Sequence, residues 1–187
     1  MTNETMKTIL TRRSIRSYLP DEVPQDAIEE ILKAGQYAAT GLGIQPWHFT
    51  VITNKDFLNR ISEEVRTLMA ASKIPMMEER AKMPGFHTFY NAPVVIIVSG
   101  DKKADYAATD CANATENMAL AAHSLGIGSC YIASFKLAMM GRRGAAFKKE
   151  MGIPENYETY YALALGYAAG DAPEPAPRRE GVVNYMK

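Results

Sequence analysis

Residues 11–18 carry the densest group of side chains that could do chemistry. Arg12, Arg13 and Arg16 stand close together there, with Ser14 between them. Arginine supplies a planar fork of donors that matches phosphate, and serine adds a hydroxyl. If the segment is extended, Arg12, Ser14 and Arg16 face the same side, because side chains alternate along an extended chain. The segment therefore indicates either a site for a long phosphorylated ligand or a solvated basic turn.

A second candidate stretch is residues 38–47, where Gly41 and Gly43 precede Pro46 and Trp47. Glycines allow the backbone to approach a flat ligand closely. The pair is not a dinucleotide fingerprint, because the third glycine is missing and the stretch follows an expected helix rather than a strand. Alone, it is equally consistent with a turn between a helix and a strand.

The composition restricts the classes of function. Lys+Arg and Asp+Glu both number 21, so the net charge is zero. A phosphate site must then be local, and no nucleic-acid partner is expected. Cys111 and Cys130 have no Cys/His cluster around them, so we expect no metal site and a reducing compartment. The apolar runs are too short to span a bilayer and the N-terminus has no signal core, so we expect a cytoplasmic protein without a membrane partner.

The hydrophobic pattern alternates helices with strands. We expect one domain over residues 1–187, of α+β or α/β class, with an extended, proline-rich C-terminal arm over about residues 171–187. Residues 72–91 are rich in methionine and proline, which suggests a mobile segment with a helical turn at 76–82. The expected helices cover residues 2–10, 24–34, 55–68, 104–125 and 137–151, and the expected strands cover 47–53, 94–98, 129–133 and 160–165.

Several motifs in this order resemble the nitroreductase family of FMN enzymes. The resemblance implies an α+β fold, with a central, mainly antiparallel sheet flanked by helices, and an intertwined homodimer. The motifs are Arg12-Arg13-Ser14-Ile15-Arg16, Gln45-Pro46-Trp47-His48-Phe49, Ala92-Pro93-Val94-Val95-Ile96-Ile97, the stretch from Asn117 to Cys130, Leu165-Gly166-Tyr167, and Arg178-Arg179.

The resemblance also implies which residues bind FMN. Arg12 and Ser14 would hold the phosphate and ribityl chain, and Arg16 would lie near the flavin N1 and O2, where a cation favours hydride transfer to the flavin. Ile132, Ala133 and Ser134 would pass the flavin ring beside N5, mostly through the backbone. Arg178 and Arg179 would reach the phosphate from the arm, and a loop with Ala39, Thr40, Gly41 and Gly43 would come from the other subunit. The full expected set is Arg12, Arg13, Ser14, Arg16, Ala39, Thr40, Gly41, Gly43, Gln45, Tyr131, Ile132, Ala133, Ser134, Arg178 and Arg179.

The implied activity is ping-pong hydride transfer from NADH or NADPH, through FMN, to a small organic acceptor such as a nitroaromatic or a quinone. No side chain is expected to be catalytic, because the flavin does the chemistry. The alternatives are an FMN-binding or storage protein, or an enzyme of the same fold that destroys flavin or removes halogen. The sequence departs from the family at Gly41 and Gly43, where members often carry serine and asparagine, and at Ala133, where many carry glutamate.

Other polar residues leave alternatives open. His87 is the histidine best placed to meet a substrate, but a surface-loop role is as consistent with its position. His123 is expected to be buried and hydrogen-bonded. Asp110, Asn113 and Asn117 share one face of the expected long helix, where we expect them to satisfy one another or a partner helix.

Overall fold

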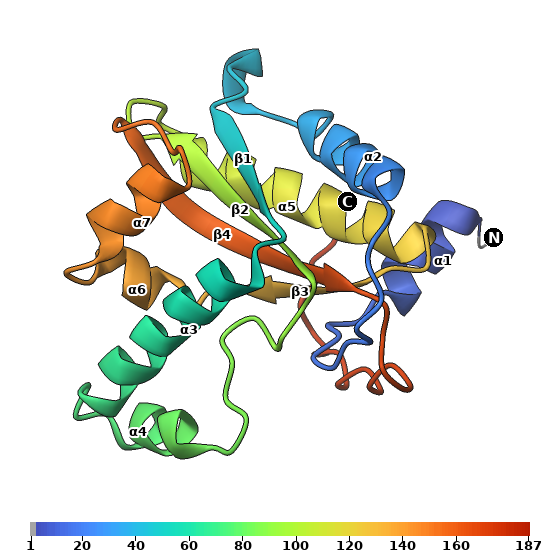
Figure 1. The fold of residues 1–187 in the computed structure, drawn as a ribbon. Helices are drawn as coiled ribbons and strands as arrows, with labels where there is room; N and C mark the ends of the chain where they lie inside the picture. The colour runs from blue at the N-terminus through green and yellow to red at the C-terminus, as the bar shows by residue number, and fades with distance from the viewer. Residues whose placement is uncertain (1–2) are drawn as a thin grey trace.

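A computed structural model describes residues 3–187 and contains one antiparallel sheet of four strands in the order β1-β2-β4-β3. The strands are β1 (Trp47–Ile52), β2 (Val94–Asp101), β3 (Gly128–Ile132) and β4 (Tyr157–Gly166). Helices cover both faces of the sheet (Figure 1). The expected α+β fold with an antiparallel sheet is thus confirmed, while the intertwined dimer stays a prediction.

All the helices except α1 fall into two groups, according to the core to which each contributes. Helices α2 and α5 pack on one face of the sheet, and α3, α4, α6 and α7 contribute to the core on the other. Their bounds are α1 (Glu4–Thr11), α2 (Gln25–Gln36), α3 (Lys55–Ala70), α4 (Pro75–Lys82), α5 (Ala107–Ser124), α6 (Lys136–Met140) and α7 (Gly144–Glu150), with a short 3₁₀ turn η1 (Gly41–Gly43).

Strand β2 explains how one sheet carries two cores. Every residue from Val94 to Gly100 is buried. Successive side chains point to opposite faces of a strand, so Val94 and Ile96 join the core under α2 and α5, whereas Val95 and Ile97 join the core under α3. A strand buried on both faces reads as a continuous apolar run, as this one does.

Three expectations about the elements need correction. The helix expected over residues 137–151 is two helices, because the chain turns sharply between Gly141 and Gly144; a Cβ on Gly144 would lie 1.9 Å from the Met139 carbonyl oxygen. Strand β4 begins at Tyr157 rather than at residue 160. Residues 72–91 are packed rather than loose, because α4 contacts α3 and the side chains of Thr88 and Phe89 are fully buried.

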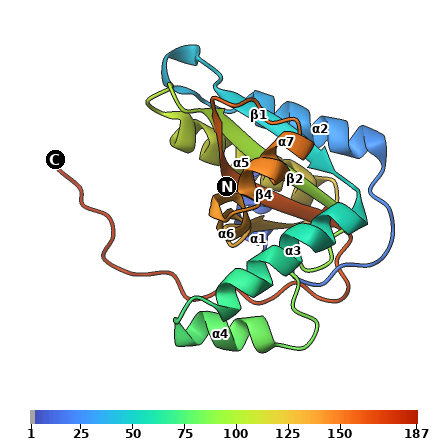
Figure 2. The ribbon, with the colours of Figure 1, turned by 60° about the vertical axis from the view of Figure 1, so that its left-hand side comes forward.

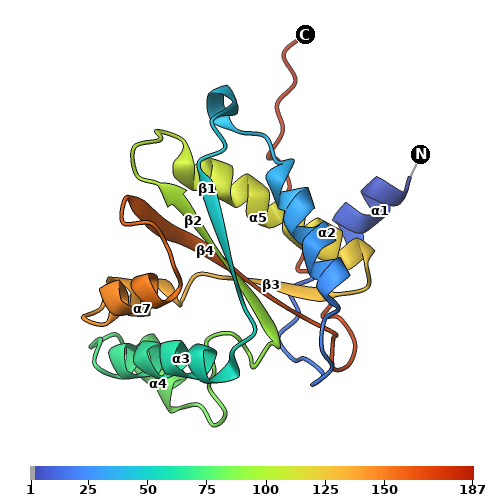
Figure 3. The same cartoon turned by 45° about the horizontal axis from the view of Figure 1, so that its top comes forward.

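The C-terminal arm leaves the body of the protein. Residues 169–187 are all exposed, and the arm extends away from the helices and the sheet (Figures 2 and 3). Near its end, Val182, Val183 and Tyr185 are 69%, 62% and 85% exposed. Among the helices of residues 3–187, none has the length and apolar character needed to cross a membrane.

Candidate functional site

The basic N-terminal segment lies along the edge of the sheet, where β3 has no other neighbouring strand. The Ile15 amide donates to the Ser129 carbonyl (2.9 Å), and Ser14 forms an isolated parallel bridge with Ser129. Further along, the Tyr18 hydroxyl donates to the Ile15 carbonyl at 2.8 Å. Strand β3 therefore fixes the extended backbone that carries the expected phosphate ligands.

Three guanidinium groups act electrostatically on one side chain of β3, the Cys130 thiol. Burial raises the pKa of the Cys130 thiol, while Arg16, the Ser14 hydroxyl, Arg12 and Arg80 act in the opposite direction. Each of these arginines is therefore close enough to act electrostatically on the same side chain. We call Arg12, Arg16 and Arg80 the guanidinium cluster. It is a local concentration of positive charge in a protein with no net charge, as a bound phosphate requires.

Arg12 is held by an acidic residue of α5. Its buried Nε lies 3.3 Å from Glu116 Oε1 in an ion pair that lacks the geometry of a hydrogen bond. The Arg12 side chain is 25% exposed, so part of it stays accessible to a ligand. A guanidinium fits an anionic ligand with oxygen acceptors, such as the phosphate of FMN. Glu116 thus fixes the position of Arg12 from α5.

Arg80 and Tyr90 belong to the site, and sequence reasoning missed both. Arg80 Nη2 donates to Tyr90 Oη at 3.2 Å, and the Arg16 guanidinium carbon lies 6.0 Å from the centre of the Tyr90 ring. Tyr90 therefore contacts both arginines. Arg80 reaches it from α4, within the segment that the sequence suggested was mobile. No spacing pattern in the sequence links residues 16, 80 and 90, because only the packing of α4 brings them together.

The turn after β3 lies beside this cluster. Ser134 Oγ is 2.6 Å from Thr88 Oγ1, and the Thr88 amide donates to Ser62 Oγ at 2.9 Å. Ala133 is exposed, so its backbone is open to a ligand, whereas Ile132 is buried in the core. Tyr131 is half-buried with its ring against Tyr161, with 5.0 Å between the centroids. Of the expected N5-side residues, Ala133 and Ser134 are the ones whose side chains lie outside the core.

The glycine loop does not meet the guanidinium cluster within one chain. Residues 39–45 project from the end of the body that carries η1, away from α1 and the segment after it (Figures 1 and 3). Leu42 at the tip is 91% exposed. If residues 39, 40, 41, 43 and 45 bind a ligand at that cluster, they must do so in another copy of the chain.

Helix α5 fixes the base of this loop. Asp110 Oδ1 accepts from the Gly41 amide (3.0 Å), Asn113 Nδ2 donates to the Ala39 carbonyl (3.1 Å), and Asn117 Nδ2 donates to the Ala34 carbonyl (3.1 Å). Gly41 also packs so tightly on Tyr106 that a Cβ there would lie 2.5 Å from its ring. The three polar residues therefore bind the backbone that ends α2, rather than one another.

The remaining expected arginines have weaker support from one chain. Arg13 Nη1 donates to the Leu10 and Arg12 carbonyls, each at 2.8 Å, and so closes the end of α1. Arg178 donates to the nearby Ala176 carbonyl at 3.3 Å, and both Arg178 and Arg179 are exposed on the arm. These two residues can bind a ligand only at a surface on which the arm packs.

Two of the three histidines, His87 and His123, have hydrogen-bond partners within the protein. His123 Nε2 is 2.8 Å from Thr11 Oγ1, and His123 is half-buried rather than fully buried as expected. Burial, and then Arg12 and Arg13, lower its pKa. His87 accepts two backbone amides through Nδ1, from Phe89 at 3.2 Å and Asn91 at 3.1 Å. That nitrogen is therefore occupied within the protein.

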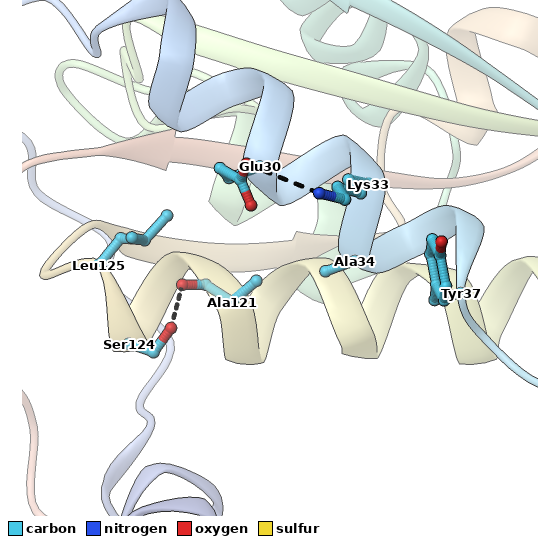
Figure 4. Close-up of a pocket in the computed structure, with 7 residues that line it drawn as sticks. All are labelled: Glu30, Lys33, Ala34, Tyr37, Ala121, Ser124 and Leu125. Carbon is cyan, nitrogen blue, oxygen red and sulfur yellow. Dashed lines mark hydrogen bonds and ion pairs between the residues drawn. The ribbon is translucent and has the colours of Figure 1, made fainter.

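Two hollows mark the surface. The larger, about 860 Å³, lies between residues 18–25, the start of α3 and the turn before β2, and includes Tyr18, His87 and Asn91. The smaller, about 320 Å³, lies between α2 and α5, where Glu30 pairs with Lys33 at 4.0 Å and Ser124 Oγ donates to the Ala121 carbonyl at 2.8 Å (Figure 4). The smaller hollow has no free donor set. The larger is lined by His87 and Asn91 but by none of the three arginines of the guanidinium cluster.

Comparison with known proteins assigns the family. The profile of the Nitroreductase family matches residues 9–167. A crystal structure of a nitroreductase with bound FMN from Bacteroides fragilis is 36% identical and covers all of both chains, with a TM-score of 0.92. A second FMN-bound nitroreductase, from Desulfitobacterium hafniense, is 29% identical over both full chains, also with a TM-score of 0.92. This chain belongs to the Nitroreductase family, a family of oxidoreductases.

A relative with a curated name agrees. A protein of Archaeoglobus fulgidus named "Putative NADH dehydrogenase/NAD(P)H nitroreductase" is 34% identical over 88% of this chain and 85% of its own length. The NADPH-flavin oxidoreductase of Vibrio harveyi is 26% identical over 94% of this chain and 70% of its own length. The resemblance drawn from the motifs is thereby confirmed at the level of the family.

Proposed function

We propose that this protein is an FMN-dependent oxidoreductase that takes hydride from NADH or NADPH and passes it to a small organic acceptor. The observation that carries the proposal is the guanidinium cluster beside β3, where Arg16 and Arg80 meet at Tyr90 and Arg12 is held by Glu116. FMN-bound family members with the same fold support the choice of cofactor. The flavin would supply the redox chemistry, accepting and then releasing hydride in a ping-pong cycle.

The residues divide the binding of FMN between them. Arg12 and Ser14 would hold the phosphate and ribityl chain. Arg16, held near Tyr90, would supply positive charge at the flavin N1 and O2 edge, where negative charge grows as hydride is accepted. The backbone at the exposed Ala133 and the half-buried Ser134 would lie beside N5. No side chain is needed as an acid or base for the hydride transfers themselves.

We also propose that two copies of the chain build each site. In one chain the glycine loop lies away from the segment after α1, and the end of the arm extends away from the body, although the family resemblance assigns both to the flavin site. Helix α1 has no buried residue, and its Ile9 and Leu10 are 48% and 57% exposed. Apolar surface of this kind is typical of an interface. A homodimer would bury it and complete both sites.

The identity of the cofactor tests the first proposal. The protein is purified, denatured, and the released chromophore is separated on a column against FMN and FAD standards. We expect FMN, because the basic residues serve one phosphate and the chain has no dinucleotide fingerprint. Released FAD, or no chromophore after incubation with excess FMN, would contradict the proposal.

A further inference from the structure

The turn before β2 contains a backbone conformation that needs an explanation. Tyr90 and Asn91 have φ values of 55° and 56°, in the left-handed region. Asparagine tolerates that region, but a bulky residue such as tyrosine adopts it only when its surroundings enforce it. Tyr90 is also the residue that contacts Arg80 and Arg16. The unusual conformation therefore lies at the guanidinium cluster.

The imidazole of His87 enforces this conformation. Its Nδ1 accepts from the amides of Phe89 and Asn91, the residues on either side of Tyr90, and its carbonyl accepts the Tyr90 amide at 3.0 Å. One side chain thus binds the backbone before and after the strained residue. A neutral ring with the proton on Nε2 is needed for Nδ1 to accept. Burial, and then Lys55, lower the pKa of His87 and favour that neutral form.

The strained turn determines where the Tyr90 side chain points. From this backbone, Tyr90 Oη receives the Arg80 guanidinium at 3.2 Å and the ring lies beside Arg16. If Tyr90 relaxed to an ordinary extended or helical conformation, its side chain would leave both arginines. Arg80 and Arg16 would then lose their shared contact with Tyr90, and the guanidinium cluster would lose its fixed geometry. A preorganised set of donors binds an anion more tightly than a mobile one.

We propose that His87 is a positioning residue for the flavin site: its Nδ1 holds the turn from which Tyr90 fixes Arg80 beside Arg16. This role rests on the proposed function, because it assumes that the guanidinium cluster binds FMN. His87 also lines the 860 Å³ cavity. The rival role is therefore contact with a substrate in that cavity through Nε2, which the sequence also suggested.

Two substitutions separate these roles. In His87→Asn, Oδ1 replaces Nδ1 at the same distance along the side chain, so the acceptor for both amides is kept. In His87→Gln, the amide lies one carbon further out, where it imitates Nε2 and leaves the turn without its acceptor. His87→Ala removes both. The full-length apoprotein of each variant is titrated with FMN, followed by flavin fluorescence, and its thermal unfolding is recorded to confirm that it folds.

We expect His87→Gln and His87→Ala to raise the Kd for FMN about tenfold, since two backbone amides lose their acceptor, while His87→Asn stays within about threefold of the wild type. The opposite order, with the Gln variant like the wild type and the Asn variant weakened, would assign the role to Nε2 and overturn the proposal. Equal Kd values for FMN in all three variants would also overturn the proposal. A wild-type protein that binds no FMN would refute the proposed function itself, and with it this role.

Tyr90→Phe is a second test that does not depend on the stability of the histidine variants. It removes the hydroxyl that receives Arg80 and leaves the backbone of the turn unchanged. We expect a Kd for FMN raised about fivefold, from the loss of one charge-assisted hydrogen bond at the cluster. A Kd equal to that of the wild type would show that Tyr90 fixes no arginine that matters for binding, and would overturn the proposal.

Discussion

At the residue scale, the candidate site is distinguished by the arginines that remain free to bind a ligand. Arg13 closes the end of α1, and Arg66 pairs with Glu63 on α3 at 2.8 Å. Arg12 pairs with Glu116 at 3.3 Å and stays 25% exposed at its side chain, and Arg16 makes one long hydrogen bond, of 3.3 Å, to the Ser14 carbonyl. Arg16 is therefore the arginine that the fold uses least and leaves available to a ligand. The local excess of positive charge comes from where these arginines lie, because the net charge of the whole chain is zero.

The first prediction concerns Arg16→Ala. Removing this guanidinium should raise the Kd for FMN about tenfold, since a charge-assisted hydrogen bond is lost. It should also lower the midpoint potential of the bound flavin, because a positive charge near N1 and O2 stabilises the reduced cofactor. Fluorescence titration and anaerobic potentiometry measure the two effects. Arg66→Ala is the matched control, with an exposed arginine removed from α3. An unchanged potential in a flavin-loaded Arg16→Ala protein would contradict the assigned role.

At the element scale, α5 links the sheet to the glycine loop. Its apolar face packs against β2 and α2, and its polar residues bind the backbone from Ala34 to Gly41. Asp110 is 3% exposed and accepts the Gly41 amide. The shape of a loop that one copy would offer to another is therefore determined by a helix of its own chain. Fixing the loop before association lowers the entropy cost of building a shared site.

Asp110 tests this link. Asp110→Ala removes the acceptor and should loosen the loop, so we expect a Kd for FMN raised about fivefold and a weaker dimer. Asp110→Asn is the control, because Oδ1 can still accept the Gly41 amide. Binding is measured by titration and association by sedimentation. If Asp110→Ala retains wild-type FMN affinity and association, the loop contributes nothing to either.

Much of the element structure could be predicted from the sequence. The apolar run of β2 and the long helix α5 each appear in local patterns that the structure follows. The sequence did not indicate which strand the motif from Arg12 to Arg16 would meet, and the structure places it beside β3. Arg80 and Tyr90 could not be found in this way. Their role depends on how α4 and the turn before β2 pack, and that turn needs a tyrosine backbone conformation that no propensity favours.

At the scale of the whole molecule, one chain is an incomplete enzyme on this account. The arm extends from the body, with Val182, Val183 and Tyr185 exposed near its end and Arg178 and Arg179 before them. A proline-rich segment of this kind has no core of its own. A second copy would give the apolar residues a surface to pack on and bring the two arginines to a phosphate. Association and flavin binding would then depend on the same segment.

Truncation after Gly170 separates these contributions when it is compared with a double substitution. Deleting residues 171–187 should weaken both dimerisation and FMN binding. The deletion removes the apolar residues that would pack on the partner together with the two arginines that would bind the phosphate. Arg178→Ala with Arg179→Ala should weaken FMN binding about tenfold and leave the dimer intact. Sedimentation and flavin titration on each protein provide the readout. A truncated protein that remains a dimer and retains its flavin would show that the arm serves neither purpose.

The central claim is that a bound FMN passes electrons from a nicotinamide, and anaerobic titration of the purified, flavin-loaded protein with NADH and with NADPH tests it most directly. We predict that at least one of the two nicotinamides bleaches the flavin absorbance, with one equivalent consumed per bound FMN, and that adding a quinone or a nitroaromatic compound then restores the colour. A flavin that stays oxidised with excess of either nicotinamide would contradict the account and leave the protein an FMN binder rather than an oxidoreductase.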